Sequence, residues 1–375
     1  MKKAIFHILF ILLYTGLLWA YNGSLELARP GDYPEGIEYA KATVSEVVES
    51  DVGQDPDYSY IRIGKQTLKL EINSGPHKGT TVQILNFVTR TTPLEGTVGT
   101  RYILGSYDGF ITANIMSYER SGLLVLLLVA FLGMVILYGR KKGLAAVAAL
   151  VVTLLNVVFL FIPMLINGVP AIPAAILVVL LSTLYTMVVL NGLCKKSLIA
   201  TACCTLCTAF AGVLAWLVGR FGWISTLNTP EVENLLFITE NTKFRIDNLL
   251  TAGILISSMG AVMDTCMSIV SSLYELRDQN PAITPKQLRK SGMNIGKDIM
   301  GTMTNTLILA FVGSSLNLIV IYYMYCMPAI SLLNTDFIVV EAVKGLIGSM
   351  AVVMSIPCAA ALTAAVLGSA KTTTP

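Results

Sequence analysis

Long runs of apolar residues, separated by short polar segments, occupy the start of the chain and nearly all of it after residue 120. A helix that crosses the hydrocarbon core of a bilayer needs about 20 mostly apolar residues. Eight stretches meet this requirement and are predicted membrane spans: 4–21, 121–139, 143–163, 170–190, 198–218, 248–270, 299–322 and 339–367. The pattern predicts a mainly α, polytopic membrane helix bundle of about eight spans.

Residues 22–120 follow another pattern, in which short runs rich in β-formers are separated by turns such as "NSGPHKG" and "TPLEGTVG". Such runs predict strands, and they cover residues 39–49, 58–64, 66–72, 80–87, 101–106 and 111–116. Five or six short strands in about 80 residues favour a small all-β domain, with an OB-like barrel as one option.

The predicted domain organisation therefore has three parts. Residues 1–21 form a first span, residues 22–120 an extracytoplasmic β domain, and residues 121–375 a seven-span membrane domain. The first span resembles a signal peptide, but Leu18 and Ala20 do not form a small-x-small cleavage site, which favours an uncleaved anchor.

Composition supports a membrane protein. Hydrophobic residues make up 54% of the chain, charged residues 13%, and the mean hydropathy is +0.70, whereas soluble domains carry about 25% charged residues. A formal net charge of +3 is too small to indicate a nucleic-acid partner. No phosphate-binding loop or nucleophile elbow occurs, and His77 stands alone in a turn, so neither a cofactor nor a metal is predicted.

The placement of basic residues predicts the orientation, because cytoplasmic loops of membrane proteins are enriched in Lys and Arg. Loops 164–169 and 323–338 contain neither, whereas the intervening loops and the N-terminus carry Lys2, Lys3, Arg140–Lys142, Lys195, Lys196, Lys286, Arg289, Lys290 and Lys297. Both termini are expected in the cytoplasm and residues 22–120 outside it.

The β domain has an acidic balance. It holds nine Lys or Arg and thirteen Asp or Glu residues, which does not favour binding of phosphates or anionic lipid, and it lacks cysteine. Its expected role is structural or the docking of a protein partner, because a fold alone implies no function.

The sixth predicted span carries an acidic residue, Asp264. Ionisable groups inside a membrane are costly and therefore mark functional sites by default. Ser257, Ala261, Asp264, Ser268 and Ser271 follow helical spacing and form one small, polar stripe. Because such a stripe is unfavourable against lipid, it is expected to face other helices.

The seventh predicted span repeats this design. Asp298, Thr302 and Asn305 share one face, and Gly301 is expected to allow close helix approach. The candidate residues for binding a solute or cation are therefore Asp264, Ser268, Asp298, Thr302 and Asn305.

The segment before this span has its own start signals. Thr284 and Gln287 are predicted to form a capping box around Pro285. Gly292 is expected to break that helix, and Asn294 to cap the membrane helix that follows.

Structural explanations compete with the functional one. Asp298 would lie in the first turn of its helix, where an acid complements the macrodipole, and Asp264 could pair with Lys297. The "CCTLC" cluster, Cys203, Cys204 and Cys207, is expected to pack in the core rather than bind metal, because no second pair or histidine accompanies it.

Two segments, "GAVMDTCMSIVSSLYEL" (260–276) and "SGMNIGKDIMGTMTNTLILAFVGSSL" (291–316), resemble the YibE/F family of bacterial multi-pass membrane proteins. The segment "SLNLIVIY" departs from it, since the family tends to have a proline after the Ser-Leu. The resemblance implies the multi-pass architecture and the bacterial cytoplasmic membrane, and it supplies no substrate.

Three functions are open at this point. A transporter or permease of a small solute or cation fits the polar faces of spans six and seven best. The alternative is a non-enzymatic envelope assembly or partner-binding membrane protein. A lesser alternative is an intramembrane aspartyl protease, although Met263-Asp264 and Ile295-Gly296-Lys297-Asp298 depart from the Tyr-Asp and Gly-x-Gly-Asp motifs of that class. Enzymatic activity is not expected.

Overall fold

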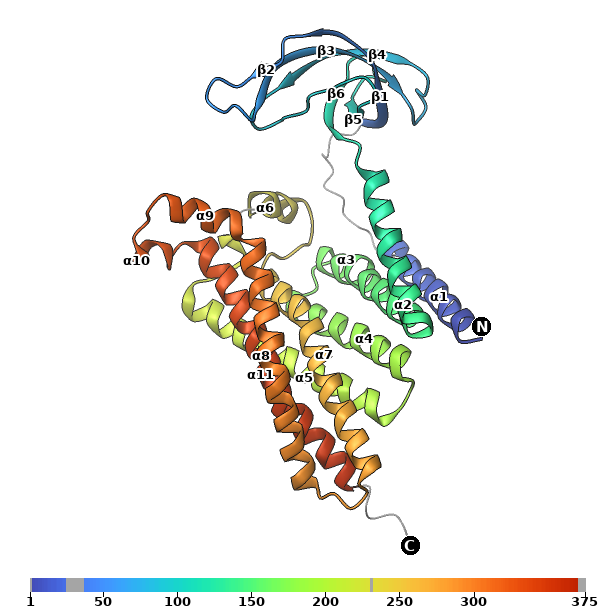
Figure 1. Cartoon of the computed structure of the whole chain (residues 1–375), viewed down its shortest axis with the longest axis vertical. Helices are drawn as coiled ribbons and strands as arrows, with labels where there is room; N and C mark the ends of the chain where they lie inside the picture. The colour runs from blue at the N-terminus through green and yellow to red at the C-terminus, as the bar shows by residue number, and fades with distance from the viewer. Residues whose placement is uncertain (1, 25–36, 230–231, 370–375) are drawn as a thin grey trace. The chain divides into compact units, whose positions relative to one another are not determined.

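A computed structural model describes residues 2–24, 37–229 and 232–369. At residues 2–11, 24, 241 and 369 it describes the backbone only. The chain divides into two units, residues 32–134 and residues 1–31 together with 135–375 (Figure 1). The division falls inside helix α2 (Ser121–Asn156), so the first turns of that helix belong to the β unit.

The β unit is built on one six-stranded antiparallel sheet, curved into a half-barrel (Figure 1). Its strands run in the order β2-β3-β1-β5-β6, and β4 pairs with β3. Their bounds are β1 Glu38–Ser50, β2 Gly53–Gln54, β3 Arg62–Ile72, β4 Thr81–Val88, β5 Arg101–Ser106 and β6 Asn114–Tyr118.

The alternating pattern of these strands places one side of the sheet in a shared core, which includes Leu68, Leu70, Ile72, Tyr102 and Leu104, all fully buried. The predicted strands 58–64 and 66–72 are wrong as separate elements, because β3 runs unbroken through Gly64. The backbone of Gly64 lies so close to the segment after β1 that a Cβ atom would be 2.1 Å from the Asp51 carbonyl oxygen. Glycine here keeps the strand continuous.

The other unit is helical. Its elements are α1 Lys2–Ser24, the later part of α2, a π-helix η1 Val157–Phe161, α3 Ile162–Ile166, α4 Ala171–Asn191, α5 Lys195–Gly222, a 3₁₀ helix η2 Thr226–Asn228, α6 Val232–Asn241, α7 Leu249–Gln279, α8 Pro285–Ser314, α9 Leu316–Met324, α10 Ala329–Leu332 and α11 Asp336–Ser369. Five segments among the described residues are long and apolar enough to cross a membrane, or six if α8 and α9 form one bent span.

Two breaks modify the predicted spans. Helix α2 folds back at Arg140, whose φ is 48° and ψ −124°, and a Cβ atom on Gly143 would meet the Val135 carbonyl oxygen at 2.1 Å. The turn predicted from the basic residues after span two is thereby confirmed. The predicted span 299–322 is not one straight helix, because α8 ends at Ser314 and α9 continues at an angle of 63°.

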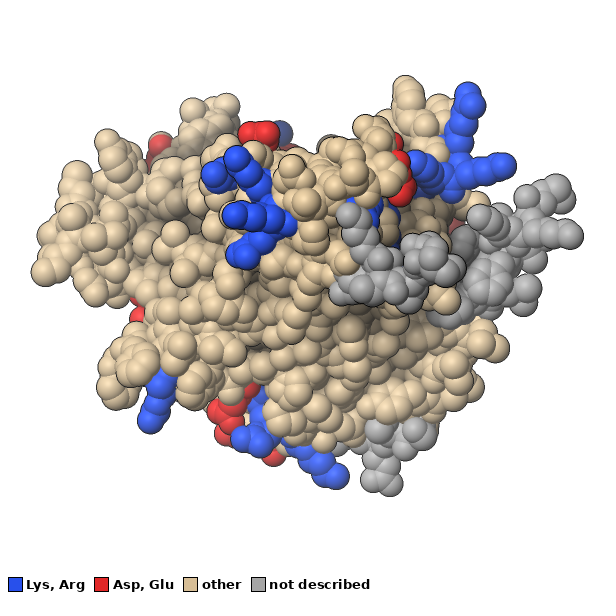
Figure 2. Space-filling model, turned by 90° about the horizontal axis from the view of Figure 1, so that it is seen from below, with Lys and Arg blue, Asp and Glu red and all other residues tan. Residues whose placement is uncertain are grey.

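Helices α5, α7 and α11 pack on one another in the centre of this unit, with α4 and α8 against them (Figure 1). Alanine, valine and cysteine are frequent in this core, which lets the helices approach closely. On the face shown in Figure 2, ionisable side chains are few and most of the surface is uncharged. The three tryptophans, Trp19, Trp216 and Trp223, all belong to the helical unit.

Candidate functional site

Asp264 is the middle residue of α7, with fifteen residues separating it from either helix end. It lies on an exposed face with Ser257, Gly260 and Ser268, while the opposite face of α7 is buried in the core. The stripe predicted from spacing therefore exists, but within a single chain it faces outward. The helices expected to cover this stripe are not found among the described residues of the chain.

Helix α8 shows the same arrangement. Asp298, Thr302 and Asn305 are all exposed, and its fully buried positions are Leu288, Gly292 and Gly296. Helix α8 contacts α7 and α11, so the polar residues of the two helices lie on neighbouring helices of one bundle. The structure thus places all five predicted site residues on outer faces of α7 and α8.

The buried glycines explain how α8 is held. A Cβ atom on Gly292 would lie 2.8 Å from Ala360 Cβ, and one on Gly296 would lie 2.1 Å from Ile356 Cγ2. Both glycines therefore let α8 approach α11 at near-backbone distance. The close approach predicted at Gly301 is wrong, since nothing lies within 4 Å of the position of its Cβ.

The capping box of Thr284 and Gln287 is confirmed, with Pro285 at the first helical position. The helix break predicted at Gly292 is wrong, because packing against α11 keeps α8 continuous. Asp298 consequently lies thirteen residues, about 20 Å, inside the helix. The macrodipole explanation for this carboxylate fails, since that effect falls off within the first turn.

The predicted site residues have few partners. Within the described part of the chain, no ion pair or hydrogen bond is formed by the side chains of Asp264, Asp298 and Asn305, so the Asp264–Lys297 pair is absent from the structure. The Thr302 hydroxyl donates to the Ile299 carbonyl oxygen at 2.8 Å. Two carboxylates and an amide in the helical unit thus have no side-chain partner among the described residues.

Asp247, by contrast, precedes α7 and forms an ion pair with Arg245 at 3.2 Å. Outside a bilayer, such an exposed pair contributes little. Glu341 and Lys344, three residues apart on α11, pair at 2.5 Å. Asp247 and Glu341 thus have local ion-pair partners, which Asp264 and Asp298 lack among the described residues.

The cysteines of α5 lie in the core. Cys203, Cys204 and Cys207 are buried, and thiols of α5 contact Cys266 of α7 and Cys358 of α11. Packing of the "CCTLC" cluster is thus what the structure shows. Cys194 and Cys326, at helix ends, are exposed.

Sequence reasoning missed one buried polar contact. Asn156, fully buried at the end of α2, donates to the Ser182 hydroxyl of α4 at 2.9 Å and accepts from Tyr14 of α1. The π-helix η1 begins directly after it, and π-turns often mark functional positions. The signal that could have revealed this contact was an asparagine inside the apolar run 143–163.

Comparison of the sequence with known protein families concerns the helical unit that carries these residues. The family model for YibE/F-like proteins matches residues 127–369. The chain belongs to the YibE/F-like family. No curated protein and no solved structure matches it.

The matched range begins inside α2 and ends at the close of α11, so both polar faces of this YibE/F-like protein lie in the family region. The strands β1–β6 lie outside it. Family membership together with the apolar helices identifies an integral membrane protein.

Proposed function

We propose that this YibE/F-like protein is a transporter or permease for a small solute or cation, and that the polar faces of α7 and α8 form its binding surface. Asp264, Ser268, Asp298, Thr302 and Asn305 would supply the oxygen ligands. Carboxylate and amide oxygens suit a hard cation or a proton relay.

One observation carries the proposal. Asp264 and Asp298 lie deep inside long helices, on exposed faces, and have no ion-pair partner among the described residues. Facing lipid without a partner, each carboxylate would be costly to keep. The positions of the two carboxylates are explained if water, an ion or a second helix surface contacts them during transport.

The test is flux through the purified chain in proteoliposomes, followed with lumenal indicators for protons, Na⁺ and K⁺. We expect at least one ion to enter faster than in empty vesicles when a gradient is applied. Flux equal to that of empty vesicles for all three ions would count against ion-coupled transport.

A second candidate rests on the same exposure, since polar residues on an outer helix face are also typical of helix–helix interfaces. The protein would then hold a partner of the envelope rather than move a solute. Photo-crosslinking from residue 264 distinguishes the two: one abundant protein adduct, together with no flux, would favour partner binding.

The fine topology is also part of the proposal. We infer eight spans in a bacterial cytoplasmic membrane, both termini in the cytoplasm, and residues 22–120 outside as an OB-like domain between spans one and two. The remaining residues, 121–375, would form the seven-span domain.

The natural cysteines test this orientation. Cys194 would face the cytoplasm and Cys326 the outside, and both are exposed. A hydrogen bond from Ser197 lowers the pKa of the Cys194 thiol and so favours its reactive thiolate. A membrane-impermeant maleimide on intact cells should label Cys326 alone, and Cys194 only after permeabilisation.

Cys194→Ser and Cys326→Ser variants assign each label to its residue. Labelling of Cys194 in intact cells would contradict the proposed orientation.

A further inference from the structure

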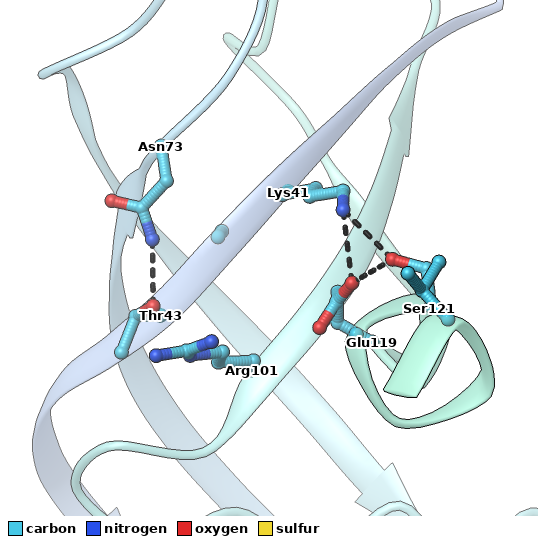
Figure 3. A pocket seen from close by; sticks show the side chains of 9 residues that line it. Lys41, Thr43, Asn73, Arg101, Glu119 and Ser121 are labelled. Atoms are coloured by element: carbon cyan, nitrogen blue, oxygen red, sulfur yellow. Dashed lines mark hydrogen bonds and ion pairs between the residues drawn. The ribbon is translucent and has the colours of Figure 1, made fainter. Parts of the chain in front are cut away.

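A pocket of about 590 Å³ opens on the β unit beside the start of α2 (Figure 3). Its polar lining consists of Lys41, Thr43, Asn73, Arg101, Glu119 and Ser121, with Val125 at its apolar side. All of these residues belong to the 32–134 unit. The pocket is unrelated to the polar faces of α7 and α8.

The sheet brings these residues together. Lys41 and Thr43 are two residues apart on β1 and so point to the same side. Thr43 pairs with Arg101 at the start of β5, and Asn73 follows the end of β3 directly. The Glu119 backbone N–H donates to the Arg101 carbonyl oxygen at 2.9 Å, which places Glu119 and Ser121 at the same edge.

The carboxylate in the pocket has local partners. Glu119 accepts from Lys41 Nζ at 2.9 Å, from the Ser121 hydroxyl, and from the backbone N–H of Gly122 at the start of α2. The hydrogen bond from Ser121 and that from Lys41 lower the pKa of Glu119 to about 2. It is therefore charged near neutral pH, and its charge is paired with that of Lys41.

The donors are not used up. The Arg101 guanidinium, with five N–H groups, has no acceptor among the described residues of the chain. The Lys41 ammonium donates two of its three N–H groups, to Glu119 and Ser121, and has one left. The Asn73 amide donates one hydrogen to the Thr43 hydroxyl oxygen, at 2.6 Å. The second amide hydrogen of Asn73 and the hydroxyl hydrogen of Thr43 remain available to a ligand.

The lining holds two cations, Lys41 and Arg101, and one carboxylate, that of Glu119, which is paired with Lys41. A pocket with several free donors and one cation in excess is complementary to an anion with several oxygens. Arginine matches phosphate oxygens with two parallel N–H groups, and lysine adds a point charge. The acidic balance of the whole domain disfavoured phosphate and anionic lipid as ligands. The local charge of the pocket differs from that balance, because Glu119, its one acidic residue, is paired with Lys41, and Arg101 is left as a further cation.

The residues that follow the pocket form the start of an apolar helix. Ser121 begins a segment apolar enough to span a membrane, and Leu123, Leu124 and Val125 are each at least 59% exposed. The pocket therefore adjoins the end of a span, where the phosphates of a bilayer lie. Val125 gives it an apolar side that suits the glycerol and first acyl carbons of a lipid.

We propose that this pocket binds the phosphate of an anionic glycerophospholipid, with Arg101 and Lys41 as its cationic ligands and Asn73 and Thr43 as further donors. The lipid would fix the β unit at the membrane surface through α2. Lipid binding here does not depend on transport, because the pocket shares no residue with the polar faces of α7 and α8 and is tested by binding alone.

The experiment uses the full chain purified in detergent and native mass spectrometry with phosphatidylglycerol or phosphatidylcholine added. We expect the wild-type protein to retain phosphatidylglycerol preferentially. Arg101→Gln should reduce that retention by roughly tenfold, as loss of a hydrogen bond to a charged group implies. Lys65→Gln removes one exposed positive charge from β3 outside the pocket and should retain the lipid as the wild type does.

Three results overturn the assignment. If Arg101→Gln retains as much phosphatidylglycerol as the wild type, the lipid does not bind in this pocket. If Arg101→Gln and Lys65→Gln lose the lipid equally, retention depends on the net charge of the protein and not on the pocket. If calorimetry with inorganic phosphate shows Arg101-dependent binding while lipid retention is independent of Arg101, the ligand is a free phosphate and the lipid is excluded. Circular dichroism of each variant confirms that loss of lipid is not loss of fold.

Discussion

Replacing Asp264 by asparagine is expected to reduce ion-coupled flux in proteoliposomes to the level of empty vesicles, with the yield of folded protein unchanged. Asparagine keeps the size of the side chain but can neither carry the charge nor release a proton. Because the Asp264 side chain is exposed and has no partner among the residues that the structure describes, the substitution breaks no visible contact. The same loss is expected for Asp298→Asn.

Asp247→Asn is the matched control. It makes the same chemical change just before α7, at an exposed residue whose ion pair with Arg245 lies outside the polar face, and flux should persist. Full transport by both the Asp264→Asn and the Asp298→Asn protein would remove these carboxylates from the mechanism. Loss of folded protein in either variant would instead assign the carboxylate to assembly.

Gly296→Ala is expected to destabilise the helical unit by roughly 1–3 kcal/mol, the usual cost of an overpacked contact. The added Cβ would lie 2.1 Å from Ile356 Cγ2, next to the backbone of α11, so either that side chain or the helix must move. The measurement is the apparent unfolding temperature in detergent, followed by circular dichroism, which should fall by several degrees.

Gly301→Ala on the same helix supplies the comparison. No atom lies within 4 Å of the position of its Cβ, and alanine favours helix over glycine by about 1 kcal/mol. Its unfolding temperature should stay or rise slightly. If the two alanine variants melt alike, Gly296 does not set the distance between α8 and α11.

The sequence was most informative where the physical constraint is local. Apolar length predicts the helices, the Thr284–Gln287 box predicts the start of α8, and the basic residues at Arg140 predict a turn. It was least informative about glycine, because the same residue serves a break, a bulge or a close contact. Gly292 was expected to end a helix, and instead it is the point at which α8 meets Ala360.

The candidate site shows the same limit. Spacing correctly grouped Asp264 with Ser268, and Asp298 with Thr302 and Asn305, on helix faces. It could not tell which neighbour covers each face, since polarity says only that a face avoids lipid. The pocket around Arg101 was hidden for another reason: its lining residues come from β1, β5, α2 and the segments that follow β3 and β6. The acidic balance of the domain also masked its local charge.

The positions of the tryptophans allow the unfolding of one unit to be followed separately by fluorescence. Trp19, Trp216 and Trp223 all lie in the helical unit, and residues 32–134 contain none. Intrinsic tryptophan emission therefore reports the melting of one unit while the other remains silent. A Gly296 variant should shift that emission transition, whereas an Arg101 variant should leave it in place, so the two units can be assayed separately in an uncut protein.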